Sequence, residues 1–288
     1  GDLLAGTLGT RRALRGYAGE VPETLEPGER IHVLNTGGVL GRCTAANPDI
    51  GAPFECEVLG AILTFPRTGD RIGRPAHISE GSLTPSDTLH CTTPIVFVAG
   101  TCMNSGKTVA AAEIVRGLSR GGRRVAACKL TGVSLRRDSL AMVDAGAVMG
   151  LSFDDSGVVS TSEKGVASVA RAILNELSRA AKPDVIVAEL GDGILGEYGV
   201  DVLLSDKALM ALSGALVVCA PDQVGAWGAT RVLKERFGLE PSVITGPATD
   251  NEVGRRFITR ELELPAHNAR RDAEGLLASI RTCLDARA

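Results

Sequence analysis

The spacing of apolar residues divides the chain into two parts with different expected structures. Up to about Ser82, glycines and prolines separate short β-prone runs, which we expect to form strands at 30–34, 38–43, 54–59 and 61–65. From Pro94 onward, short apolar runs alternate with longer segments of helical character. The pattern predicts a β-rich N-terminal domain at 1–82, a Ser-, Thr- and Pro-rich linker at 83–93 and an α/β domain at 94–288.

The second part is expected to be a parallel sheet covered by helices on both faces. Strands are predicted at 95–99, 124–129, 158–159, 184–190, 215–220 and 242–245, and helices at 106–120, 138–150, 163–181, 224–237, 252–260 and 273–285. Alternating strands and helices are typical of parallel sheets, because each crossover between parallel strands needs a long connection. Ligands of such sheets bind at the carboxyl ends of the strands, so the residues there are the candidates for binding and catalysis.

Composition narrows the possible partners. The 288 residues carry a net charge of −3 and contain 3% aromatic residues, so neither a basic field nor stacking platforms favour nucleic acid. No apolar run reaches the roughly 18 to 20 residues that cross a bilayer. The seven cysteines are scattered and form no Cys-x-x-Cys pair. These features favour a reduced, cytoplasmic protein without a zinc site or a membrane partner.

A strand, a loop and a helix start at Pro94–Thr108, PIVFVAGTCMNSGKT, predict a phosphate-binding loop. Its first glycine, Gly100, lies one position earlier than in the pattern G-x-x-x-x-G-K-[ST]. Loop amides and the helix N-terminus would face the phosphates, with Lys107 at the β and γ phosphates and Thr108 at Mg²⁺. We expect nucleotide contacts from Gly100, Thr101, Cys102, Met103, Asn104, Ser105, Gly106, Lys107 and Thr108.

Acidic residues follow the apolar strand at 184–190. It ends in Glu189-Leu-Gly-Asp-Gly, and a carboxylate leaving a buried strand for a Gly-rich loop is suited to hold Mg²⁺ opposite Thr108. Glu189 is the stronger candidate and Asp192 the second, with an exposed acidic turn as the alternative. Gly191 would let the backbone approach a phosphate or substrate closely.

Basic residues follow the strand at 124–129. Lys129 is expected to point into the same crevice and bind a phosphate or a substrate carboxylate. Arg136 and Arg137 fit either an anion clamp or a solvated basic loop. Asp138 fits a metal ligand, a general base or a helix N-cap. The predicted substrate-binding residues are Lys129, Thr131, Gly132, Arg136, Arg137, Gly191 and Asp192, and the predicted metal ligands are Thr108, Glu189 and Asp138.

Two residues after the last predicted strand are candidates for contacts with the nucleotide base. Asp250 and Asn251 follow the strand at 242–245, and the loops after the later strands of a nucleotide site often supply base contacts. Ordinary turn and N-cap chemistry explains both residues equally well. They are therefore predicted to bind the cofactor, with an ordinary turn or helix N-cap as the alternative.

The phosphate loop GTCMNSGKT resembles that of dethiobiotin synthetase and the related cobyrinic acid a,c-diamide synthases, in the SIMIBI class of P-loop NTPases. Lys129 with Thr131-Gly132, and Glu189-Leu-Gly-Asp-Gly, are similar to two further segments of that family, and the resemblance covers roughly residues 94–250. It implies ATP and Mg²⁺ use, with Lys107 and Lys129 near the transferred phosphoryl group. Leu190 stands where the family has glycine, and the N-terminal part has no counterpart in dethiobiotin synthetase.

These features predict an ATP- or GTP-dependent enzyme that uses Mg²⁺ and phosphorylates a small acidic metabolite, as a ligase-type activator or a kinase. Lys107, Lys129 and Glu189 are the expected catalytic residues, and a homodimer is the expected assembly. One alternative is a nucleotide-dependent conformational ATPase or GTPase of metallochaperone or assembly type. Another is a domain that binds a different phosphate ligand without hydrolysis. A pocket beside Lys129 that is large enough for a small acid would favour the enzyme.

Overall fold

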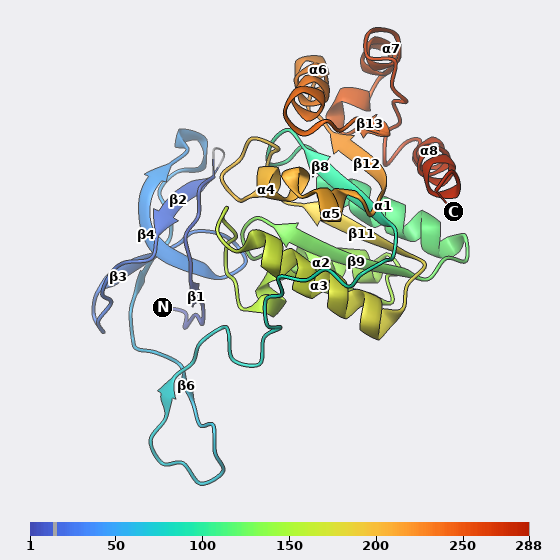
Figure 1. Ribbon diagram of the computed structural model, residues 1–288. Coiled ribbons are helices and arrows are strands. Elements are labelled where there is room, and N and C mark those ends of the chain that lie inside the picture. Colours follow the sequence, from blue (N-terminus) through green and yellow to red (C-terminus); the bar gives the residue numbers. More distant parts are fainter. Residues whose placement is uncertain (14–15, 288) are drawn as a thin grey trace.

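The computed structural model describes residues 1–13 and 16–287, and it contains a parallel α/β domain and a smaller β-rich N-terminal region (Figure 1). The six strands of the main sheet are all parallel and lie in the order β10-β9-β11-β8-β12-β13. Their bounds are β8 Ile95–Gly100, β9 Val125–Thr131, β10 Met149–Ser152, β11 Val185–Leu190, β12 Ser213–Cys219 and β13 Val243–Thr245. This arrangement confirms the predicted fold, that of a P-loop NTPase domain.

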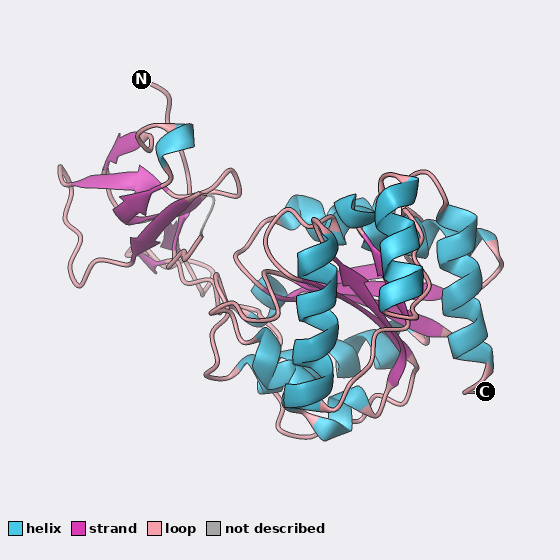
Figure 2. Ribbon diagram, turned by 90° about the horizontal axis from the view of Figure 1, so that it is seen from above, coloured by secondary structure: helices cyan, strands magenta, loops and turns pink. Residues whose placement is uncertain are grey.

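Helices cover both faces of this sheet, as Figure 2 shows from above. On one face, α1 (Lys107–Arg120), α2 (Arg136–Asp144) and α8 (Ala273–Asp285) pack on alternate strand residues such as Val96 and Val98. On the other, Ile95 and Phe97 pack beneath α3 (Val166–Ala181), α4 (Val200–Ser205), α5 (Lys207–Met210), α6 (Gln223–Val232) and α7 (Glu252–Glu261). Both faces of β8 are therefore buried, which explains its unbroken apolar run.

Two predictions for the middle of the chain are wrong. The helix expected at 138–150 ends at Asp144, and β10 follows it and pairs with β9. Residues 158–159 form no strand; Val159 instead packs beside the N-terminal region. Helices α4 and α5 had no counterpart in the prediction, although Asp206 caps α5 by accepting from Ala208 N and Leu209 N.

The N-terminal region forms a small sheet in the order β1-β4-β3-β5, with β2 also paired to β4. Its strands are β1 Thr7–Leu8, β2 Tyr17–Glu20, β3 Arg30–Val33, β4 Val39–Ala46 and β5 Glu55–Glu57, and a separate hairpin contains β6 Leu63–Thr64 and β7 Arg74–Pro75. The predicted linker segment then runs along α3, where Asn175 Oδ1 accepts from His90 N at 2.7 Å. None of the helices in the described residues has the length and apolar character of a membrane span.

Candidate functional site

The loop between β8 and α1 has the backbone of a phosphate cradle. Gly106, at the N-cap position of α1, has φ +98°, and Asn104 has φ +61°. No side chain caps the first turn of α1, so its amides are available to an anion. This local structure follows from the sequence, since a glycine is needed where the loop turns left-handed into the helix.

Glycines after two strands on opposite sides of β8 hold this loop in place. A Cβ atom on Gly193, after β11, would lie 2.5 Å from the carbonyl oxygen of Thr101. A Cβ atom on Gly246, after β13, would lie 2.5 Å from the carbonyl oxygen of Ser105. The loop is therefore packed between two backbone segments that only glycine allows to come so close.

Lys107 is buried at the centre of the loop. Its Nζ donates hydrogen bonds to the carbonyl oxygen of Cys102 at 2.8 Å and to Ser105 Oγ at 3.4 Å. Burial lowers the pKa of Lys107, while the nearby charge of Glu189 opposes that shift. A desolvated ammonium beside uncapped helix amides is well suited to bind the terminal phosphates of a nucleotide.

Thr108 and Glu189 face each other across the crevice between α1 and the end of β11. Thr108 Oγ1 donates a 3.1 Å hydrogen bond to Glu189 Oε1. The other carboxylate oxygen, Oε2, is buried and has no hydrogen-bond partner among the described residues. Burial raises the pKa of Glu189, with opposing effects from the charges of Lys129 and Lys107.

This unpartnered oxygen fits a Mg²⁺ ion, because a buried carboxylate without a partner is costly and a hard cation satisfies it. No group of three His, Cys, Asp or Glu side chains that could hold a metal occurs in the described part of the chain. The site thus resembles a nucleotide-dependent Mg²⁺ site, in which phosphate and water supply most ligands.

Lys129 forms a buried ion pair with Asp138. Lys129 Nζ lies 2.6 Å from Asp138 Oδ2, and both residues are less than a tenth exposed. Lys129 also lies beside Glu189 in the sheet register. Asp138 lies in the first turn of α2, whose N-cap position is Leu135, so the N-cap interpretation of Asp138 is wrong. The pair places a cation and a carboxylate beside the carboxyl end of β9.

The other predicted substrate residues have different environments. Arg137 lines the cavity, while Arg136 is turned toward Asp154 and Asp155, each 3.2 Å from its guanidinium. Hydrogen bonding to Asp155 raises the pKa of Arg136, so its charge is already paired. Thr131 is buried and donates to the carbonyl oxygen of Gly191 at 2.8 Å, which ties the two strand-end loops together.

Gly132 and Asp192 also line the cavity. Asp192 has φ +75°, and burial raises the pKa of its carboxyl against the opposing effect of a hydrogen bond from the Gly193 amide. The Gly132 amide donates to Thr161 Oγ1 at 2.9 Å. The loops after β9 and β11 therefore meet at the same edge of the sheet, as their strand ends predict.

Asp250 and Asn251, the two candidates for base contacts after β13, have different environments in the structure. Asp250 lines the cavity and accepts a 2.8 Å hydrogen bond from Asn268 Nδ2. Asn251 instead caps α7, where its side chain accepts a hydrogen bond from Gly254 N. Its hydrogen bonding is therefore that of an ordinary helix N-cap, the alternative given in the sequence analysis. Asn268 and Arg270 also line the cavity and were missed by the sequence analysis. Both residues follow Ala266, which forms an isolated parallel β-bridge with Ile244. The sequence around Ala266 shows no strand pattern that would predict this bridge.

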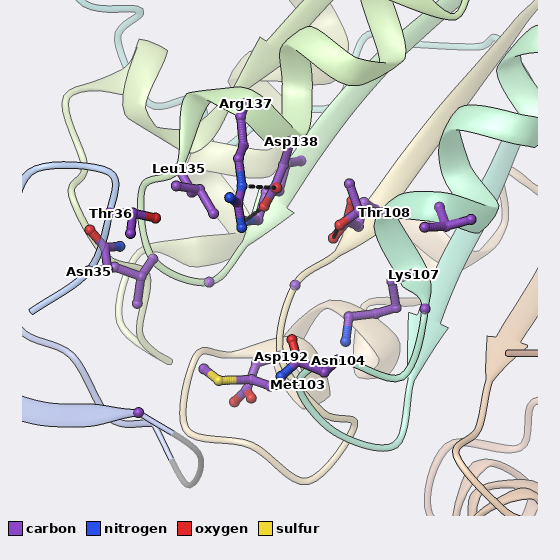
Figure 3. A pocket seen from close by; sticks show the side chains of 18 of the residues that line it. Asn35, Thr36, Met103, Asn104, Lys107, Thr108, Leu135, Arg137, Asp138 and Asp192 are labelled. Carbon is purple, nitrogen blue, oxygen red and sulfur yellow. Dashed lines mark hydrogen bonds and ion pairs between the residues drawn. The ribbon is translucent and has the colours of Figure 1, made fainter. Parts of the chain in front are cut away.

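One cavity of about 860 Å³ joins these groups, and the N-terminal region forms part of its wall. Figure 3 shows Lys107 and Thr108 on one side and Asn35 and Thr36 on the other, with Arg137 between them. The volume lies toward the upper end of the roughly 300–1,000 Å³ of small-molecule sites. The cavity therefore extends well beyond the phosphate loop.

The parallel sheet, the cradle after β8 and the facing carboxylate at the end of β11 define a P-loop NTPase domain. No family model and no curated protein matches the chain. Solved structures resemble it in part. The signal recognition particle receptor FtsY from Elizabethkingia anophelis is 11% identical, with a TM-score of 0.44 over 70% of this chain and 68% of that one.

Two further solved structures are similar to a comparable degree. The hydrogenase maturation factor HypB from Archaeoglobus fulgidus is 15% identical, with a TM-score of 0.43 over 67% of this chain and 91% of that one. A DUF1611 family protein from Anabaena variabilis is 17% identical, with a TM-score of 0.44 over 69% of this chain and 63% of that one. The finer resemblance to dethiobiotin synthetase stays a prediction.

Proposed function

We propose that this protein is a Mg²⁺- and nucleotide-dependent enzyme that transfers a phosphoryl group to a small acidic metabolite, as a ligase-type activator or a kinase. The observation that carries the proposal is the Thr108–Glu189 pair with its unpartnered Oε2, beside the buried Lys107, in a cavity that continues past the phosphate loop. A site for the nucleotide alone would not need the space beside Lys129 and Arg137.

The residues support phosphoryl transfer because this chemistry depends on positioning and charge neutralisation more than on covalent catalysis by the protein. Lys107 and the uncapped amides of α1 would hold the phosphates, and Thr108 and Glu189 would hold Mg²⁺. When bound, the ion would neutralise charge on the phosphate oxygens. Lys129, fixed by Asp138, would hold the acceptor acid and oppose the repulsion between two anions.

Positively charged side chains in the part of the cavity beside Lys129, where the acceptor would bind, support an acidic substrate. Lys129 and Arg137 line the same cavity as Lys107, and the charge of Lys129 is already shared with Asp138. Arg137 Nε also lies 4.0 Å from Asp138 Oδ1, so Lys129 and Arg137 share a single carboxylate. A guanidinium binds a carboxylate or a phosphate in bidentate geometry, so this side of the cavity suits an anionic acceptor.

The same cavity favours an enzyme over the nucleotide-dependent conformational protein, since such a switch would not need an acceptor site. Asp250 and Asn268, at the end of the cavity near β13, are proposed to contact the base. The use of ATP, a homodimeric state and a cytoplasmic location stay predictions from the sequence.

Nucleotide turnover tests the proposal. We would measure release of nucleoside diphosphate from ATP and from GTP, with and without a panel of small mono- and dicarboxylic acids. At least one acid should stimulate turnover, and the stimulation should require Mg²⁺. Full-rate turnover in the absence of any acid would contradict the acceptor assignment.

A further inference from the structure

The N-terminal region forms a wall of the cavity opposite the phosphate loop. Its contributions include Arg11, Tyr17, Leu34, Asn35 and Thr36. In Figure 3, Asn35 and Thr36 lie across the cavity from Lys107 and Thr108. A ligand that fills the space between them would contact both parts of the chain.

Specific contacts hold this wall against the P-loop domain. Tyr198 Oη accepts a 2.6 Å hydrogen bond from Arg12 N, and Asn35 Nδ2 donates to the carbonyl oxygen of Ser134 at 3.0 Å. Val39 packs with the buried Tyr198 and with Met103 of the phosphate loop. The wall is thus connected to the loop after β9, which leads from Lys129 to Arg137, and to the loop after β11.

Arg11 is the feature of this wall that points to a ligand. It lines the cavity and is partly buried, and its guanidinium donates to the carbonyl oxygen of Leu34. It forms no ion pair with any of residues 1–13 and 16–287, whereas its neighbour Arg12 pairs with Glu197. Burial lowers the pKa of Arg11. A partly desolvated guanidinium with spare donors and no carboxylate partner is a site prepared for an anion.

We propose that the N-terminal domain forms the acceptor half of the site and binds a small carboxylic acid through Arg11, with the carbon skeleton of the acid against Tyr17. This inference rests on the proposed function for its choice of acceptor, but the binding site itself does not require that transfer occurs. It assigns the N-terminal domain a direct part in substrate binding.

Calorimetric titration tests this proposal on the full chain. Acetate, succinate and glutarate are the probes, succinamide is the uncharged control, and each is titrated with and without Mg²⁺ and a non-hydrolysable nucleotide analogue. The variants are Arg11→Gln and the control Arg30→Gln, which removes an exposed arginine paired with Glu55 on the same domain. A third variant, Thr36→Trp, fills the cavity from an exposed position that tolerates a large side chain.

Wild type and Arg30→Gln should bind at least one acid but not succinamide. Arg11→Gln should bind that acid about 10- to 100-fold more weakly, the range for loss of a hydrogen bond to a charged group. Thr36→Trp should also lose acid binding, which keeps the test valid if Arg11→Gln fails to fold. Affinity for the nucleotide analogue should be unchanged in all three variants.

Three results would overturn the proposal: no acid binds wild type, Arg11→Gln binds the acid as tightly as wild type, or Arg11→Gln weakens nucleotide binding instead. Failure of the proposed function is distinguishable from these. It would appear as Arg11-dependent acid binding in a protein that binds no nucleotide analogue or never turns it over.

Discussion

Thr108 Oγ1 donates a hydrogen bond to Glu189 Oε1 and leaves Oε2 of the same carboxylate buried without a partner among the described residues. The two residues are far apart in sequence, and the parallel pairing of β8 with β11 brings them together. A buried, half-satisfied carboxylate is costly to the folded protein. A cation bound there, as proposed above, would satisfy this oxygen.

Replacement of Glu189 by Gln should therefore stabilise the protein in the absence of Mg²⁺ and nucleotide. Burial raises the folded-state pKa of Glu189 above its unfolded value. Folding thus binds protons, and this group lowers the stability progressively as pH rises through the window from the unfolded to the folded pKa. At pH values above the folded-state pKa of Glu189, the Tm of Glu189→Gln should be higher than that of wild type. The variant should also lack the loss of stability that Glu189 causes as pH rises through that window.

The same variant should bind Mg²⁺ with the nucleotide about 10- to 100-fold more weakly, as expected for a disturbed metal site. Glu274→Gln, at an exposed carboxylate, is the matched control and should change neither property. A Glu189→Gln protein with lower Tm and unchanged Mg²⁺ dependence would contradict the role assigned to Glu189.

The effects of replacing Lys129 and Asp138 on the free energy of unfolding should be strongly coupled, whereas activity should require Lys129 itself. Lys129→Met leaves a buried carboxylate without its 2.6 Å partner, which should cost about 3–5 kcal/mol in chemical denaturation. The double variant Lys129→Met/Asp138→Leu should recover most of that loss, because both charges are gone, yet stay inactive. Acid-stimulated turnover in the double variant would contradict a role of Lys129 in transfer.

Glycines behind the phosphate loop provide a test of its packing. Gly193→Ala should push the loop away, because the added Cβ would lie 2.5 Å from the carbonyl oxygen of Thr101. The strain should amount to about 1–3 kcal/mol and weaken nucleotide binding about tenfold or more. In the control Gly228→Ala, on α6, the Cβ meets nothing within 4 Å, so this variant should gain about 0.5–1 kcal/mol of stability with unchanged binding. Equal nucleotide affinities of the two variants would argue against this packing.

The main sheet was predictable where its strands are buried on both faces, because short apolar runs rich in β-branched residues and followed by glycine, such as 95–99, are typical of such strands. Strand β10 was missed because it lies at the edge of the sheet and is only partly buried, so its residues need not be strongly apolar. The phosphate loop was predictable because its glycines and Lys107 are constrained locally by the turn and the anion.

The rest of the site depends on contacts between distant segments. Asn268 reaches the cavity through the bridge of Ala266 to Ile244, and Arg11 through the packing of the N-terminal region around Tyr198. Neither contact leaves a local pattern in the sequence. The pairing of Arg136 with Asp154 and Asp155 was also unpredictable, since it depends on how the chain turns after β10.

The most direct test of the central claim is equilibrium binding of Mg²⁺-ATP and Mg²⁺-GTP to wild type and to Lys107→Ala. Lys107 is buried with its ammonium turned onto the phosphate loop, so its loss should weaken binding of the preferred nucleotide about 10- to 100-fold. Lys234→Ala, at an exposed lysine paired with Glu240, should bind like wild type. If Lys107→Ala binds both nucleotides as tightly as wild type, the loop after β8 is not the phosphate site and the account fails.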